Sequence, residues 1–130
     1  MPVKSGGIEK MSKSKNNVVE PSAIIGKFGA DTARAFVMFA GPPDQSAAWS
    51  NSGAEGTFRF MRRLWNFGFT HQDVIKENVK LDVSKLNHEE KAVRRDIYTA
   101  LKQAEFDLDR MQYNTVVSAA MKMLNSLDSL

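Results

Sequence analysis

Three lysines, two serines and two asparagines fall within residues 10–17, close to the amino-terminal end of the chain. Met11 is the one apolar residue in this stretch, so the segment cannot bury itself and should form an exposed loop. A lysine offers a compact charge with three donors, and serine hydroxyls and backbone N–H groups can complete the hydrogen bonds of a phosphate. These residue types indicate an anion site. The alternative is a solvated basic loop, because short motifs also match by accident.

The elements that position this loop follow from turn residues and apolar spacing. A Gly-Gly turn between two short extended runs, residues 3–4 and 8–9, predicts a small β-hairpin that leads directly into the loop. Pro21 suits the first position of a short helix, and Gly29 suits its end. A second short helix is expected from about Ala30 to Ala40, before a Gly-Pro-Pro stop.

Three longer amphipathic helices are expected in the rest of the chain. The first has capping-box spacing at Ser52 and continues to about Asn78. Asn87 can cap the second and Asn114 the third. Because only a short turn joins the last two helices, they should pack antiparallel.

The predicted fold is therefore mainly α, with a short β-hairpin and loop, two short helices, and a partial antiparallel bundle of long helices. We divide it into residues 1–50, which carry the loop, and residues 51–130, an incomplete helical bundle. A composition of 42% hydrophobic and 25% charged residues is typical of a globular domain.

Other properties of the sequence limit the class of protein. No apolar run is long enough to cross a membrane, and the lack of cysteine excludes disulfides and thiolate metal sites. Both properties fit a cytoplasmic protein. Residues 1–80 hold 11 Lys and Arg against 7 Asp and Glu, whereas residues 81–130 hold 7 against 8. A polyanion would therefore be drawn to the first part.

Three arginines, Arg59, Arg62 and Arg63, share one face of the first long helix and could contact RNA phosphates. The alternative is a solvated helix face, which is the usual role of charges at this spacing. His71 and His88 have no metal-binding partner at helical spacing, so we expect no metal site.

The residues Lys10-Met11-Ser12-Lys13-Ser14 have the form of the K-M-S-K-S signature of class I aminoacyl-tRNA synthetases. Several downstream segments resemble the leucyl-tRNA synthetase family in the same order. These segments are residues 28–34, 38–45, 49–50, 62–66 and 113–115. Ordered matches of this kind are far more specific than one pentapeptide.

The resemblance implies ATP-dependent activation of leucine and its transfer to tRNA(Leu). It implies that Lys10 and Lys13 act in catalysis on the ATP phosphates, and that Met11, Ser12 and Ser14 complete the ATP-binding loop. Mg²⁺ would accompany the phosphates without being held by this chain. Residues 1–50 would then be the signature loop and stem-contact region, and residues 51–130 the start of the helical anticodon-binding domain.

The resemblance also implies that parts of the enzyme lie elsewhere. The sequence contains neither an H-x-G-H signature nor an editing domain, so we expect a fragment that is inactive alone, with leucine and ATP bound mainly by another domain. Apolar faces exposed in such a fragment could cause self-association. The alternatives are a non-catalytic helical RNA-binding module that retains the loop, or the corresponding fragment of an isoleucine or valine enzyme.

Overall fold

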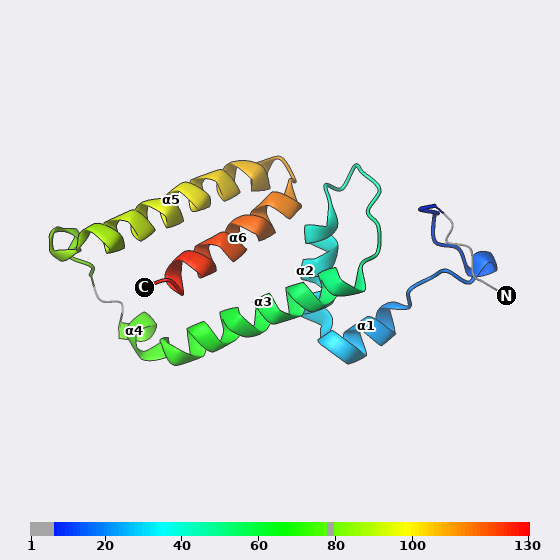
Figure 1. The fold of residues 1–130 in the computed structure, drawn as a ribbon, viewed down its shortest axis with the longest axis horizontal. Helices are drawn as coiled ribbons and strands as arrows, with labels where there is room; N and C mark the ends of the chain where they lie inside the picture. The colour runs from blue at the N-terminus through cyan, green and yellow to red at the C-terminus, as the bar shows by residue number, and fades with distance from the viewer. Residues whose placement is uncertain (1–6, 78–79) are drawn as a thin grey trace.

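The computed structural model describes residues 7–77 and 80–130, which form six α-helices and two 3-10 turns (Figure 1). The helices are α1 (Pro21–Phe28), α2 (Ala30–Ala40), α3 (Asn51–Thr70), α4 (Gln72–Glu77), α5 (His88–Asp109) and α6 (Tyr113–Leu127). The 3-10 turns are η1 (Lys13–Lys15) and η2 (Val83–Lys85). The fold is therefore mainly α, as the sequence predicts.

The predicted β-hairpin is wrong. The described residues contain no β-strand, and Ile8 and Glu9, the expected second arm, have no regular secondary structure. The expected first arm, residues 3–4, lies outside the described residues. An isolated two-stranded hairpin is only marginally stable unless one face packs on a core. Ile8 is 89% exposed, so this segment lacks the packing that a hairpin would need.

The two short helices begin and end where the sequence predicts. Pro21 occupies the first turn of α1, where its missing N–H costs no helical hydrogen bond. Gly29 ends α1 with a positive φ of 85°, and its N–H donates to the carbonyl of Ile25 at 2.8 Å. Because a left-handed backbone suits glycine best, Gly29 can end one helix and start α2 directly.

The first long helix differs from the prediction at both ends. Its N-cap is Ser50 rather than Ser52, and the Ser50 hydroxyl accepts from the Gly53 N–H at 3.1 Å. It ends at Thr70, where the sequence predicts one element to Asn78. At His71 the ring Nδ1 lies 2.9 Å from the Phe67 carbonyl oxygen, and the separate helix α4 follows. Asn78 itself lies outside the described residues.

The caps of the last two helices show one correct and one wrong prediction. Asn87 caps α5 through a capping box: its side chain accepts from the Glu90 N–H at 2.9 Å, and its own N–H donates to the Glu90 carboxylate at 2.8 Å. The N-cap of α6 is Gln112 rather than Asn114, after a turn in which Met111 has a φ of 58°. The helices α5 and α6 pack antiparallel as predicted (Figure 1).

Helix α2 holds the molecule together, because it packs against α1, α3 and α6 (Figure 1). Its Phe36 side chain is 5% exposed and meets the ring of Trp49 edge-on, with 4.9 Å between the ring centroids. A Cβ atom at position 53 would lie 2.8 Å from Cε2 of Phe36, so Gly53 permits the close approach of α3. The loop at residues 10–17 connects through α1 to this core.

Several large apolar side chains are exposed on the helices. Trp65 is 77% exposed and Phe69 66%, and both line a hollow of about 420 Å³ on α3 together with Met61 and Leu64. This is the α3 face on which the sequence predicts exposed apolar surface. Self-association through it stays a prediction. No helix within residues 7–77 and 80–130 has the length and apolarity needed to span a membrane.

Candidate phosphate-binding loop

The loop is a compact turn rather than an extended strap. Within it, η1 is formed by two backbone hydrogen bonds: the Lys15 N–H donates to Ser12 O, and the Asn16 N–H donates to Lys13 O, both at 3.1 Å. Asn16 has a φ of 52°, a left-handed conformation that asparagine tolerates better than most residues. This residue turns the chain back on itself.

The side chain of Asn17 closes the loop. Its Oδ1 accepts from the Ser12 N–H at 2.7 Å, and its Nδ2 donates to the Lys10 carbonyl oxygen at 3.3 Å. The hydroxyls of Ser12 and Ser14 are hydrogen-bonded to each other at 2.8 Å. The sequence analysis gives Asn17 no role, although an amide that can donate and accept at once is a common partner for turn backbones.

The three lysines of the loop differ in their surroundings. Lys15 Nζ is paired with the carboxylate of Glu9 at 2.7 Å. Lys10 and Lys13 are exposed, and neither forms an ion pair with any residue that the structure describes. The two lysines of the signature are therefore the ones whose charge is available to an anion.

A hollow of about 800 Å³ lies between the loop and the segment that leads into α3. Lys10, Met11 and Asn17 line one side of it, and Ala48 and Trp49 are among the residues on the other. Ser12, Lys13 and Ser14 do not line it. The predicted loop residues are thus held together by the turn, while two of them also face a concave surface.

The three arginines on α3 do not form one free cluster. The guanidinium of Arg63 forms an ion pair with Asp128 and donates to Asn125 Oδ1 at 3.0 Å, so it connects α3 to the end of α6. Arg62 lies over the ring of Phe58, 5.8 Å from its centroid. Arg59 is exposed and has no ion pair among the described residues.

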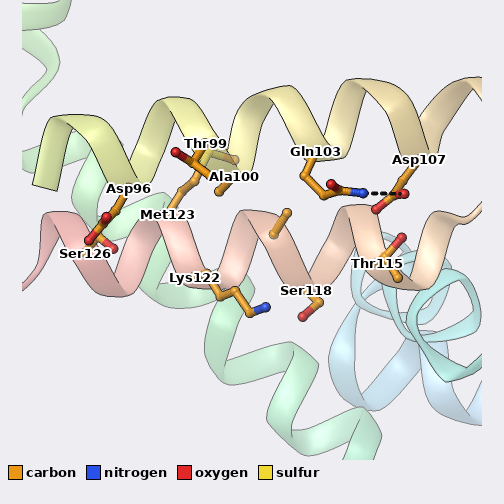
Figure 2. Close-up of a pocket in the computed structure, with 11 residues that line it drawn as sticks. Asp96, Thr99, Ala100, Gln103, Asp107, Thr115, Ser118, Lys122, Met123 and Ser126 are labelled. Carbon is orange, nitrogen blue, oxygen red and sulfur yellow. Dashed lines mark hydrogen bonds between the residues drawn. The ribbon is translucent and has the colours of Figure 1, made fainter.

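A second hollow of about 680 Å³ lies along the α5–α6 hairpin and is largely polar (Figure 2). In it, Gln103 Nε2 donates to Asp107 Oδ1 at 2.9 Å. It is lined by residues of α5 and α6 alone, so it includes none of the predicted lysines or arginines. Within the part of the chain that the structure describes, no group of three or more His, Asp and Glu side chains is arranged to hold a metal ion.

Comparison with known proteins agrees with the loop. The family described as tRNA synthetases class I (I, L, M and V) matches residues 3–50, which include the loop, α1 and α2. A leucine–tRNA ligase of Paraburkholderia xenovorans is 59% identical over 128 residues, which is 98% of this chain. That of Burkholderia multivorans is 57% identical over 127 residues.

This chain is homologous to leucine–tRNA ligases. It spans about 15% of the length of these curated relatives. Its fold is similar to part of a leucyl-tRNA synthetase of Agrobacterium radiobacter, solved in a ternary complex with tRNA and LeuAMS. That comparison has a TM-score of 0.76 and 24% identity, and covers 92% of this chain and 16% of the other. The leucine enzyme is therefore confirmed over the isoleucine and valine alternatives.

Proposed function

We propose that this chain belongs to a leucine–tRNA ligase that activates leucine with ATP and transfers it to tRNA(Leu), in the cytoplasm, and that residues 10–14 bind the ATP phosphates. One observation carries the assignment of the loop: Lys10 and Lys13 stand unpaired on a hydrogen-bonded turn, whereas Glu9 neutralises Lys15. The high identity to leucine–tRNA ligases supports the reaction.

In the proposed activation step, the leucine carboxylate attacks the α-phosphorus of ATP. The bond from that phosphorus to the bridging oxygen breaks, so leucyl adenylate forms and pyrophosphate leaves. Negative charge grows on the leaving group, and a lysine placed there stabilises the transition state more than the bound substrate. Lys10 and Lys13 supply such charges, while Ser12 and Ser14 hold the turn. The 3′-terminal ribose of the tRNA then attacks the leucyl carbonyl and releases AMP.

Mg²⁺ would shield the ATP phosphates when bound. The described residues hold no acidic cluster for it, so any Mg²⁺ at this loop would arrive on the nucleotide. The chain's own contribution to the activation step is cationic and comes from the lysines.

The direct test is leucine-dependent ATP–pyrophosphate exchange by the full-length protein that contains this chain. We expect exchange with leucine and much weaker exchange with isoleucine or valine, because a pocket shaped for one aliphatic side chain discriminates against its neighbours. Absence of exchange with every amino acid, together with salt-dependent tRNA binding, would instead indicate the non-catalytic RNA-binding module.

The 130-residue chain alone is expected to show no exchange above a no-protein blank. Lysines can stabilise a leaving group only when ATP and leucine are held in a reactive geometry, and most of the length of the relatives lies outside this chain. Exchange should be measured at high protein concentration with saturating leucine. Leucine-dependent activity of this chain would contradict the proposal that another domain supplies the substrate pockets.

We also propose that Arg59 and Arg62 contact tRNA phosphates. Both side chains are exposed on α3, whereas Arg63 is engaged by Asp128. The double change of Arg59 and Arg62 to Ala should lower the slope of log K against log salt for tRNA binding by up to about 2 units, from roughly 0.9 per lost duplex phosphate contact.

Arg63→Ala is the matched control, and its slope should stay close to that of the unchanged protein. Filter binding over a series of salt concentrations provides the measurement. If the double variant keeps the original slope, Arg59 and Arg62 belong to a solvated helix face.

A further inference from the structure

We propose that Asn17 is a positioning residue, which holds the loop in the shape that presents Lys10 and Lys13 to the phosphates of ATP. This inference rests on the proposed function of the loop. It adds a residue outside the five signature positions, and it assigns the role to a side chain that touches backbone rather than substrate.

The geometry gives Asn17 a double contact. One face of its amide accepts from the Ser12 N–H at 2.7 Å, and the other donates to the Lys10 carbonyl at 3.3 Å. These two contacts join the end of the loop to its beginning, across the turn at Lys13–Lys15. The left-handed backbone of Asn16 returns the chain so that the Asn17 amide can reach both partners.

The loop has few other means of holding this shape. Lys10, Met11 and the three residues of η1 are all exposed, so apolar burial contributes little. The Lys15–Glu9 ion pair joins two exposed side chains, and such a pair contributes little because water and salt screen it. Hydrogen bonds to the Asn17 amide are therefore the main restraint on the backbone between Lys10 and Ser12.

Such a restraint acts on catalysis through preorganisation. A loop that is already folded loses less conformational entropy when its lysines meet the developing charge. A loosened loop would still carry both lysines but would occupy the reactive arrangement less of the time. Loss of the amide should therefore slow the chemical step while each lysine is intact.

The chemistry of the residue predicts how substitutions at position 17 differ. Asn17→Ala removes both contacts. Asn17→Asp keeps an acceptor for the Ser12 N–H but loses the donor to the Lys10 carbonyl, since an ionised carboxylate only accepts. A simple charge or stability effect would not separate these two variants in this way.

The test combines kinetics with amide hydrogen exchange in the full-length protein. For Asn17→Ala we expect kcat of ATP–pyrophosphate exchange to fall by about tenfold, as expected from losing hydrogen bonds of modest net strength. Exchange of the peptide that contains Ser12 should accelerate by a similar factor, because the Ser12 N–H loses its acceptor. The melting temperature should not change, since the loop lies outside the helical core.

Asn17→Asp should retain most of the Ser12 protection and fall between Ala and the unchanged protein in kcat. Glu9→Gln is the matched control at the loop, and it should change kcat by no more than about twofold. The inference is overturned if Asn17→Ala leaves kcat or Ser12 exchange unchanged, or if the melting temperature falls with kcat. A harmless Lys13→Ala would overturn the proposed function instead, without altering Ser12 protection.

Discussion

Lys13→Ala is expected to reduce kcat of leucine-dependent ATP–pyrophosphate exchange by about a hundredfold to a thousandfold in the full-length protein. A lost transition-state contact of this type costs about 2.7–4 kcal/mol. The KM for ATP should change far less, because the proposed contact strengthens as charge develops on the leaving pyrophosphate. Steady-state exchange at varied ATP concentration separates the two parameters.

Lys15→Ala is the matched control, because it also removes a lysine from the loop. The structure gives a reason to expect a mild effect, since the Lys15 ammonium is already paired with Glu9. Lys13→Arg should not restore full activity, because a planar guanidinium presents its donors differently from a compact ammonium. Equally mild effects of Lys13→Ala and Lys15→Ala would mean that the loop only attracts anions.

Phe36→Ala is expected to lower the free energy of unfolding of the 130-residue chain by about 3–5 kcal/mol. Phe36 is buried on α2, and it packs on Trp49 and against the backbone of α3 at Gly53. Small domains are typically stable by about 5–15 kcal/mol, so this loss could leave a large share of the chain unfolded. Denaturant unfolding followed by circular dichroism gives the value.

Val37→Ala is the control for Phe36, because it removes apolar atoms from the same helix at a position that is 63% exposed. It should change the free energy of unfolding by no more than about 0.5 kcal/mol. A similar loss in both variants would show that a core around Phe36 does not carry the packing of α2.

Elements with local signals could be predicted from the sequence. Pro21, Gly29 and Asn87 each favour a helix end through their own backbone or side chain, and the structure uses all three in that way. The β-hairpin failed because its stability depends on a packing partner that spacing does not reveal. The cap of α3 moved from Ser52 to Ser50 because two nearby serines offer the same hydroxyl.

The candidate site divides along the same line. Lys10 and Lys13 could be predicted because the signature is contiguous. The pairing of Arg63 with Asp128 could not, since the two residues lie 65 positions apart and meet only through the tertiary fold. The Asn17 contacts are local, and an asparagine directly after a residue with left-handed backbone is the signal that would have indicated them.

The position of α2 has a consequence for the order of folding. The contacts between α5 and α6 cross a single short turn, whereas α2 meets α6 across most of the chain. Closing a long loop costs more entropy than closing a short one, so the α5–α6 hairpin should form early and its docking on α2 late. During synthesis the amino-terminal residues emerge first. The loop and α2 would therefore wait, with Phe39 and its apolar neighbours exposed, until α6 leaves the ribosome and completes their packing.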